Sequence, residues 1–239
     1  MKTYTLKYKK FGEYSILVEW PQIINEKVLN NILLFKSELD KKNDVKIISC
    51  KTSYNSLLVT YSDHNNKISE LKSFYNEIKI SKKLDIDKWE IPVCYETEFG
   101  KDLNLLEKNL SLSINKIISI HSTKQYTVYN IGFLPGFLYL GGMDERIFHP
   151  RKEKPAMNVE KGSVGIGGSQ TGIYPNNSPG GWQIIGKTPI DLFDINRNKP
   201  CLVKPGDKIN FHSISKKEFQ LITVQEKSGI YKLKKTIND

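Results

Sequence analysis

Cysteine is scarce in this chain of 239 residues, which contains only Cys50, Cys94 and Cys201. Their number is odd, they lie far apart, and none has the close spacing of a zinc-binding pair. The sequence therefore predicts neither a disulfide framework nor a metal site, and it favours a reducing compartment.

Long apolar runs are absent as well. No segment reaches the roughly 18 consecutive apolar residues of a membrane-spanning helix. The first residues, MKTYTLKYKKFGEYSILVEW, lack the charged and then apolar pattern of a secretory leader. We expect a cytoplasmic protein with no membrane partner.

Arginine is rare although the chain is basic. The 36 Lys and Arg residues outnumber 26 Asp and Glu and give a formal charge of +10, yet only Arg146, Arg151 and Arg197 are arginine. Base readout and bidentate phosphate contacts favour arginine, and no nucleic-acid motif accompanies the charge. The charge therefore indicates a solvated lysine surface and no nucleic-acid partner.

The common signatures of self-sufficient catalysis are also missing. The chain has no Gly-x-Ser-x-Gly elbow, no His-Glu-x-x-His pair and no Ser, His and Asp in a catalytic order. None of its glycine-rich stretches ends in the Gly-Lys-Ser/Thr of a nucleotide-binding loop. Nothing in the sequence therefore has the character of a self-sufficient catalyst.

Residues 1–100 alternate between strand and helix patterns. Apolar, β-branched runs predict strands at 14–20, 45–51, 56–61 and 89–95. One helical face is marked by Val28, Ile32, Phe35 and Leu39, and a second by Ile68, Leu71, Tyr75 and Ile78. The resulting order β, α, β, β, α, β is that of a ferredoxin-like α+β domain. Pro92 favours an edge position or a break in the last strand.

Two short helices, the second capped by Ser113, are predicted within a connector at residues 101–124. Beyond it twelve of the 16 glycines fall between Gly132 and Gly186, and helical periodicity nearly disappears. Strands are expected at 126–133, 163–168, 181–188, 192–195, 201–203, 208–211 and 219–225. Many short strands with glycine bends predict a closed or nearly closed β-barrel domain over residues 125–239. The fold class is therefore α+β.

Three glycine-rich stretches lie in this second domain: 132–142 (GFLPGFLYLGG), 162–175 and 178–189. In the first, much apolar surface sits on backbone that can form neither a regular helix nor a long strand. We expect positive φ at most of Gly132, Gly136, Gly141 and Gly142. The bend would bring the main chain near a bound small molecule, with Gly132, Phe133 and Gly136 at the pocket.

Polar side chains that are not charged follow in the other two stretches. They are Gln170, Thr171, Tyr174, Trp182, Gln183 and Thr188. Such groups suit a pocket that orients a small amide or carboxylate. Alternatively, the glycines are barrel corners and Trp182 fills the core.

Titratable candidates are few. His121 and His149 are potential acid/base groups, whereas His64 and His212 have the settings of incidental residues. Arg151 is the best anion anchor, because its fork binds a carboxylate bidentately; otherwise it is a surface residue near Glu145 or Glu153. Four carboxylates beside turns are expected to be solvated: Asp144, Glu145, Asp191 and Asp194.

Taken together, the ordered motifs GFLPGFLYLGG, HPR, GSVGIGGSQTGIYP, SPGGWQIIGKTP, LFD and PGDKINF resemble the family of bacterial 5-oxoprolinase B subunits, also called the Kip inhibitor or allophanate hydrolase subunit 1 family. The resemblance extends upstream through SYNSLLVTY, IPVCYETEFGKDL and IISIHS, and so covers nearly the whole chain. It departs at Pro155-Ala156, where the family commonly has Pro-Arg.

The resemblance implies that the barrel is cyclophilin-like and that the chain acts with the A and C subunits of 5-oxoprolinase. The complex would open 5-oxo-L-proline to L-glutamate, with ATP used by the complex and no cofactor in this chain. Under this hypothesis Arg151 holds the substrate carboxylate, and Gln170, Thr171 and backbone N–H groups polarise oxygens. His121 and Gln170 are the catalytic candidates, while Tyr174, Trp182 and Gln183 contact substrate.

Two alternatives remain open at this stage. The Kip name implies a regulatory protein that inhibits a sporulation-type histidine kinase, with the apolar loop as its docking surface. Likeness to urea carboxylases implies subunit 1 of an allophanate hydrolase or urea carboxylase-like system. The chain contains no biotin-acceptor lysine flanked by methionines.

Overall fold

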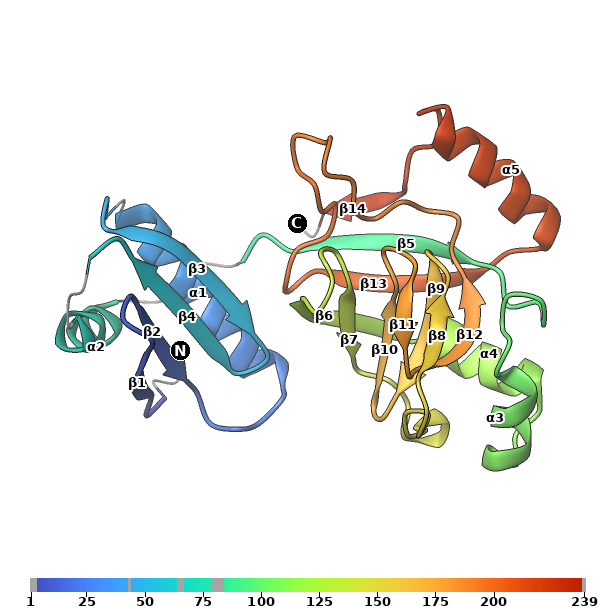
Figure 1. Cartoon of the computed structure of the whole chain (residues 1–239), viewed down its shortest axis with the longest axis horizontal. Coiled ribbons are helices and arrows are strands. Elements are labelled where there is room, and N and C mark those ends of the chain that lie inside the picture. Colours follow the sequence, from blue (N-terminus) through green and yellow to red (C-terminus); the bar gives the residue numbers. More distant parts are fainter. Residues whose placement is uncertain (1–3, 43, 64–66, 79–83, 238–239) are drawn as a thin grey trace. The chain divides into compact units, whose positions relative to one another are not determined.

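The computed structural model describes residues 4–42, 44–63, 67–78 and 84–237. The chain forms two compact units, residues 1–85 and 86–239 (Figure 1). The division therefore falls before the predicted strand at 89–95 and not after residue 100. The predicted connector, residues 101–124, lies wholly inside the second unit.

The first unit is an antiparallel sheet packed against helices. Its elements are β1 (Lys7–Phe11), β2 (Ser15–Glu19), α1 (Glu26–Lys42), β3 (Ile47–Ser53), β4 (Ser56–Tyr61) and α2 (Ile68–Glu77). The strand order is β1-β2-β4-β3, and α1 runs along one face of this sheet (Figure 1). Val18, Leu57 and Val59 alternate with less buried neighbours and pack against Ile32 and Phe35, which confirms the period-two and helical patterns.

The fourth strand of this sheet is β1, which the apolar pattern did not predict. Its sequence, KYKKF, is rich in lysine, and its residues are exposed or half-buried. β1 lies at the sheet edge, where charged side chains discourage pairing with other chains. The predicted fourth strand, at 89–95, belongs instead to the sheet of the second unit.

The second unit contains one large mixed sheet, several helices and a small two-stranded sheet. Its first half comprises β5 (Asp87–Val93), α3 (Leu103–Leu110), α4 (Ile114–Thr123), β6 (Gln125–Ile131), β7 (Leu138–Gly141) and the 3-10 turn Glu145–Ile147. Its second half comprises β8 (Ala156–Val159), β9 (Ser163–Gly167), β10 (Gln170–Ile173), β11 (Ser178–Gly180), β12 (Gln183–Lys187), β13 (Lys208–Ser213), α5 (Lys216–Lys227) and β14 (Lys235–Ile237).

The strand order of the large sheet is β12-β9-β10-β7-β6-β13-β5-β14. All pairs are antiparallel except β5 with β13. At the far end of the sheet, Cys94 and Lys187 exchange two backbone hydrogen bonds of 2.9 Å, which join the residue after β5 to β12. This single bridge is not a strand ladder, so the sheet curves without closing into the expected barrel.

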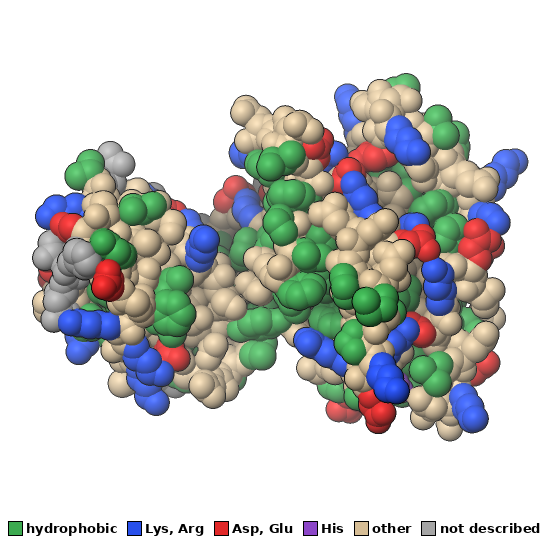
Figure 2. All heavy atoms as spheres, in the orientation of Figure 1, with side chains coloured by type: hydrophobic (Ala, Val, Ile, Leu, Met, Phe, Trp, Pro, Cys, Tyr) green, Lys and Arg blue, Asp and Glu red, His purple; other side chains and the backbone are tan. Residues whose placement is uncertain are grey.

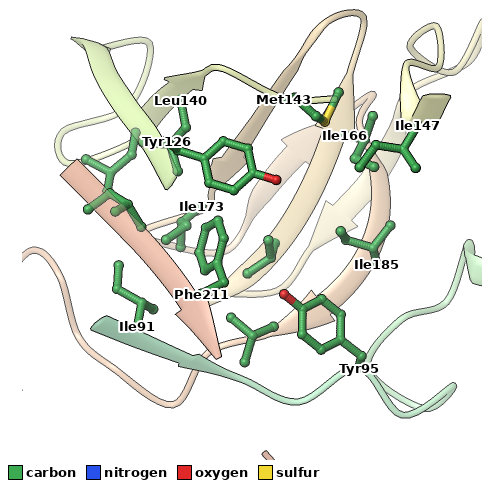
Figure 3. Packing of buried hydrophobic residues seen from close by; sticks show 14 of the residues in the cluster. Ile91, Tyr95, Tyr126, Leu140, Met143, Ile147, Ile166, Ile173, Ile185 and Phe211 are labelled. Atoms are coloured by element: carbon green, nitrogen blue, oxygen red, sulfur yellow. The ribbon is translucent and has the colours of Figure 1, made fainter. Parts of the chain in front are cut away.

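Apolar side chains on the concave side of this sheet form the main core. Figure 3 shows Ile91, Tyr126, Leu140, Ile166 and Phe211, each from a different strand, pointing into one interior. Helices α3 and α4 contribute further buried residues to it: Leu103, Leu106, Ile117 and Ile120. The hydroxyl of Ser113 accepts from the backbone N–H of Lys116, which confirms the predicted cap of α4.

Three strand predictions in this unit were wrong or incomplete. Residues 219–225 are helical, because Ser215 and Glu218 form a capping box that starts α5. Residues 192–195 and 201–203 are joined only by an isolated bridge between Phe193 and Cys201. Pro92 lies in β5, an interior strand, and not at an edge. β14 pairs with β5 only as far as Trp89, so the missing N–H of Pro92 breaks no bond to β14.

Candidate functional site

A second, smaller apolar cluster lies on the opposite, outer face of the large sheet. Its buried members are Phe137, Val159, Tyr174, Trp182 and Ile184. The rings of Phe137 and Tyr174 lie edge to face at 4.9 Å, and those of Phe137 and Trp182 at 5.4 Å. Val159 of β8 brings the two-stranded sheet β8–β11 against this cluster. We call these rings, together with Tyr139, the aromatic platform.

Glycines in two neighbouring strands make room for the platform. A Cβ atom at Gly167 would lie 2.6 Å from the indole of Trp182, and one at Gly172 would lie 2.9 Å from it. Such distances are shorter than real Cβ contacts, so the indole can lie against the sheet only because these residues lack side chains. The glycines of 162–175 therefore serve close approach as well as bends.

Arg151 lies over the platform. Its Cζ atom is 5.5 Å from the centroid of the Trp182 ring. The next residue, Lys152, donates its backbone N–H to the carbonyl oxygen of Gly181 at 2.6 Å, which fixes the chain beside Trp182. Arg151 is exposed, so its guanidinium is accessible to an anion while its flat face rests on an indole.

Tyr139 and Tyr174 contribute hydroxyl groups that remain neutral. Burial raises the pKa of both phenols, and the nearby Arg151 opposes that rise only in part. The ring of Tyr139 is 5.8 Å from that of Trp182. The rings of Phe137, Tyr174 and Trp182 are buried, so the accessible part of this face consists of the half-buried Tyr139 and the exposed cation of Arg151.

Gln170 lies on the same face of the sheet. It pairs directly with Gly167 in the antiparallel register of β9 and β10, and directly opposed residues share a face. Gly167 lies against the indole of Trp182, and Arg151 lies over the same indole. Arg151 and Gln170, predicted to serve one site, are therefore on one side of the second unit.

The segment GFLPGF forms a turn at the border of the platform. The backbone N–H of Gly132 donates to the carbonyl oxygen of Phe137 at 3.2 Å. Phe133 has φ +70° and its side chain is 73% exposed, an uncommon state for an aromatic residue. Its ring contacts that of Phe137 edge to face at 6.2 Å. The turn therefore presents an aromatic ring to solvent.

The φ prediction for this stretch was half right. Gly136 and Gly142 have positive φ, whereas Gly132 and Gly141 do not. A Cβ at Gly141 would lie 2.5 Å from the ring of Tyr129, so this glycine serves close packing. The stretch is no helix, and β7 begins within it.

Thr171 lies on the core side, away from the platform. Its hydroxyl donates to the carbonyl oxygen of Gly165 at 2.9 Å and therefore accepts from Nε2 of His121 at 2.9 Å. Nδ1 of His121 then accepts from the hydroxyl of Tyr95 at 2.8 Å. The predicted substrate contact of Thr171 is replaced by a bond inside the core.

His121 is fully buried, and both of its ring nitrogens are engaged. Burial lowers its pKa to about 3, so the ring is neutral. A general base needs a nitrogen that can reach a substrate proton. This arrangement gives His121 a role in joining α4 to β10 and leaves its predicted catalytic role without an available nitrogen.

Gln183 also points away from the platform, because Trp182 and Ile184 take the outer face of β12. Its side-chain amide donates to the carbonyl oxygen of Pro150 at 3.2 Å. Nδ1 of His149 donates to the same oxygen at 3.0 Å, and its Nε2 accepts from Asn109. Gln183 and His149 therefore hold the segment that precedes Arg151.

The carboxylates noted in the sequence do not converge. Asp144 forms a two-bond pair with Arg146, which holds the pKa of that carboxyl well below its usual range. Asp194 caps a turn through the N–H of Asn196, and Asp191 pairs with Lys161 at 2.7 Å. No group of His, Cys, Asp and Glu that could hold a metal occurs in the part of the chain that the structure describes.

Sequence reasoning missed Tyr139 and Phe137 as platform members, although both stand in the motif GFLPGFLYLGG. Their alternation along β7 could have indicated one common face.

Hydrophobic side chains are exposed over the strands of the second unit on the face in view (Figure 2). Among the described residues, no helix has the length and apolar character needed to cross a membrane.

Known proteins share the fold of this chain. A family model described as carboxyltransferase domain, subdomain C and D, matches residues 6–203. The urea carboxylase structure of Kluyveromyces lactis superposes with a TM-score of 0.78 at 20% identity, covering 98% of this chain and 24% of that one. At this identity the likeness concerns the fold alone, which is of the carboxyltransferase-domain type.

Full-length relatives narrow the family. The 5-oxoprolinase B subunit of Bacillus subtilis is 36% identical over 231 residues, 90% of this chain and 96% of the relative. That of Haemophilus influenzae is 38% identical over 203 residues, 84% of this chain and 94% of the relative. The chain therefore belongs to the family of 5-oxoprolinase B subunits.

Proposed function

We propose that the chain is a component of a cytoplasmic 5-oxoprolinase complex that opens 5-oxo-L-proline to L-glutamate. Homologues of the A and C subunits would be its partners, and ATP would be consumed by the complex, with no cofactor in this chain. The observation that carries the proposal is the identity to two B subunits along nearly their whole length.

The aromatic platform is the proposed substrate-binding surface. The five-membered lactam would lie against the half-buried ring of Tyr139, beside Trp182, with its carboxylate on the guanidinium of Arg151, whose fork matches two oxygens. Gln170, on the same face, would donate a hydrogen bond to the lactam oxygen. Thr171, Gln183 and His121 have no part in this arrangement.

Ring opening needs activation because the lactam amide is resonance-stabilised. Transfer of the γ-phosphoryl group of ATP to the lactam oxygen would make the ring carbon electrophilic. Addition of one water molecule to that carbon would break the C–N bond, leave the nitrogen as the amino group and give γ-glutamyl phosphate. A second water molecule would then hydrolyse this acyl phosphate to glutamate and phosphate. This chain would hold the carboxylate and orient the ring, which supplies proximity rather than acid/base chemistry.

We also propose that the first unit is ferredoxin-like and the second cyclophilin-like. The β-α-β-β-α order of β2 to α2 supports a ferredoxin-like origin for the first unit, with β1 as its fourth strand. The curved sheet with its Cys94–Lys187 bridge supports a cyclophilin-like relation for the second unit.

A regulatory role is the second candidate. Phe133 is exposed on a turn with positive φ, and Met157 of β8 is 85% exposed. Exposed apolar side chains of this kind suit a protein partner such as the histidine kinase that the Kip name implies. A third candidate is a urea carboxylase-like role, which is supported by the carboxyltransferase-type fold alone.

Arg151→Ala in the assembled complex tests the proposal. We expect ATP-dependent glutamate release to lose at least about tenfold in kcat/KM, mainly through a higher KM for 5-oxo-L-proline, because a charged hydrogen-bonding pair is lost. Arg146→Ala is the matched control, since Arg146 pairs with Asp144 away from Trp182. Unchanged kinetics for Arg151→Ala would refute the platform as the substrate site, and a kinase captured without the A and C subunits would favour the regulatory candidate.

A further inference from the structure

A cavity of about 320 Å³ separates α5 from the end of β12 and the segment that follows it. Pro189, Ile190 and Phe219 give it an apolar wall, and Thr188 and Thr223 add hydroxyl groups. Its charged border consists of Lys161, Lys187, Asp191, Glu226 and Lys227. None of these residues belongs to the aromatic platform.

Helix α5 is only loosely packed over this cavity. None of its residues is fully buried, although Phe219 lies 4.6 Å, ring to ring, from Phe99. Leu221 and Val224, on the outward side, are 57% and 63% exposed. The cavity is open to solvent on one side, and its volume falls within the range of small-molecule sites.

The charges at the border are nearly balanced. Lys161 pairs with Asp191 at 2.7 Å, and Lys187 pairs with Glu160 at 2.6 Å. Glu226 accepts from the backbone N–H of Asp191 at 3.2 Å and lies 3.5 Å from Arg197.

Lys227 is the remaining cation, because within the described ranges it forms no ion pair with another residue. Each acid that lines the cavity thus has a cationic partner, although Arg197 also lies 3.9 Å from Asp194, and the charge of Lys227 is left over. A ligand with one negative charge would neutralise the remaining positive charge of Lys227.

We infer that this cavity binds a small monocarboxylate with a compact apolar body. The ammonium group of Lys227 meets the carboxylate, and the body of the ligand lies against Phe219, Pro189 and Ile190. The inference rests on the volume, wall and charge of the cavity and not on the proposed function.

The site has a structural link to the platform. A ligand in the cavity contacts the segment from Thr188 to Asp191, and Phe193 follows two residues later. A Cβ atom at Gly136 would lie 2.4 Å from Cβ of Phe193, so Phe193 packs tightly against the turn that precedes Phe137. We therefore expect occupancy of the cavity to shift the backbone resonance of Gly136 as well.

The test is an NMR titration of the full chain labelled with ¹⁵N. Cyclopentanecarboxylate is the probe, and cyclopentanecarboxamide is the neutral isostere at equal ionic strength. We expect the acid to shift the amides of Ile190, Asp191 and Thr223, with at least about tenfold weaker binding of the amide, which corresponds to about 1.4 kcal/mol. Equal binding of the two compounds would overturn the charge assignment.

Variants distinguish binding in the cavity from binding at the aromatic platform. Lys227→Gln should weaken binding of the acid several-fold, whereas Lys217→Gln, an exposed lysine of α5 that does not line the cavity, should not. Thr223→Trp should abolish binding by filling the space. Shifts confined to the indole of Trp182, or no shifts at millimolar acid, would refute the site. Either result leaves glutamate release by the complex, which tests the proposed function, untouched.

Discussion

The guanidinium of Arg151 lies 5.5 Å above the indole of Trp182, and this pair joins two segments that are about 30 residues apart in the sequence. The glycines beneath the indole and the backbone bond from Lys152 to Gly181 hold the two side chains at this spacing. Arg151 is exposed although the Trp182 ring is buried, and a cation–π contact at an exposed site contributes only about 0.5–1 kcal/mol. The pair therefore serves recognition more than stability.

Substitutions of the two residues should therefore differ in their effect on stability, which should depend on Trp182 and hardly on Arg151. Trp182→Leu should lower the free energy of unfolding by about 2–3 kcal/mol, because a buried ring is truncated within the platform. Arg151→Ala should change it by less than about 0.5 kcal/mol, since the side chain is exposed. Urea denaturation followed by circular dichroism measures both, and similar losses for the two variants would contradict this division.

Gly172→Ala should be costly for its size. The added Cβ would lie 2.5 Å from the carbonyl oxygen of Leu138 and 2.9 Å from the Trp182 ring. Backbone on a paired strand cannot move easily, so we expect a loss of about 1–3 kcal/mol in unfolding free energy and altered Trp182 fluorescence. Ser169→Ala, at a nearby exposed position, is the control; equal stability of the two variants would show that the strand yields.

His121 should make stability depend on pH. Its pKa is lowered to about 3 by burial, whereas an unfolded histidine titrates near 6.5. Between these values the unfolded state holds a proton that the folded state does not, so stability is complete above about pH 6.5 and falls as the pH drops. The slope is at most about 1.4 kcal/mol per pH unit.

Urea denaturation of the parent chain and His121→Gln, from neutral pH to about pH 4, checks this expectation. The variant should be less stable at neutral pH, because the bonds to Tyr95 and Thr171 are disturbed, and its stability should vary less with pH. Equal slopes for the two proteins would assign the pH dependence to other groups.

Phe133→Asn should lower activity without lowering stability. Asparagine tolerates positive φ better than an aromatic residue, so unfolding free energy should stay constant or rise by up to about 1 kcal/mol. If the exposed ring contacts substrate or a partner subunit, activity of the complex should fall. Thermal unfolding and glutamate release measure the two effects, and a clear loss of stability would show that the ring packs more firmly than its exposure indicates.

The helices and most strands of the first unit were readable from the sequence, since periodicity depends on local spacing, whereas several short strands of the second unit were not predicted. The apolar positions of α1 and α2 and the alternation in β4 predicted their buried faces, and Ser113 predicted the start of α4. The spacing of apolar residues in 219–225 fits both a strand and a helix. The local pattern predicted a strand, but the cap at Ser215 starts a helix there.

Strand partners could not be read in the same way. The segment at 89–95 has strand character in any setting, but its pairing with β13 depends on a distant part of the chain, since Lys88 is aligned with Lys208. Lysine-rich β1 has weak strand character and forms because the edge of the first sheet is open to it.

Composition and ordered motifs alone determined the family and pointed to the glycine-rich half, Arg151 and Trp182. Only the tertiary structure decided which polar side chains accompany them, because neighbouring residues of a strand face opposite sides of the sheet. Gln170 therefore shares a face with Trp182, while Thr171, one residue later, is bonded to His121 in the core.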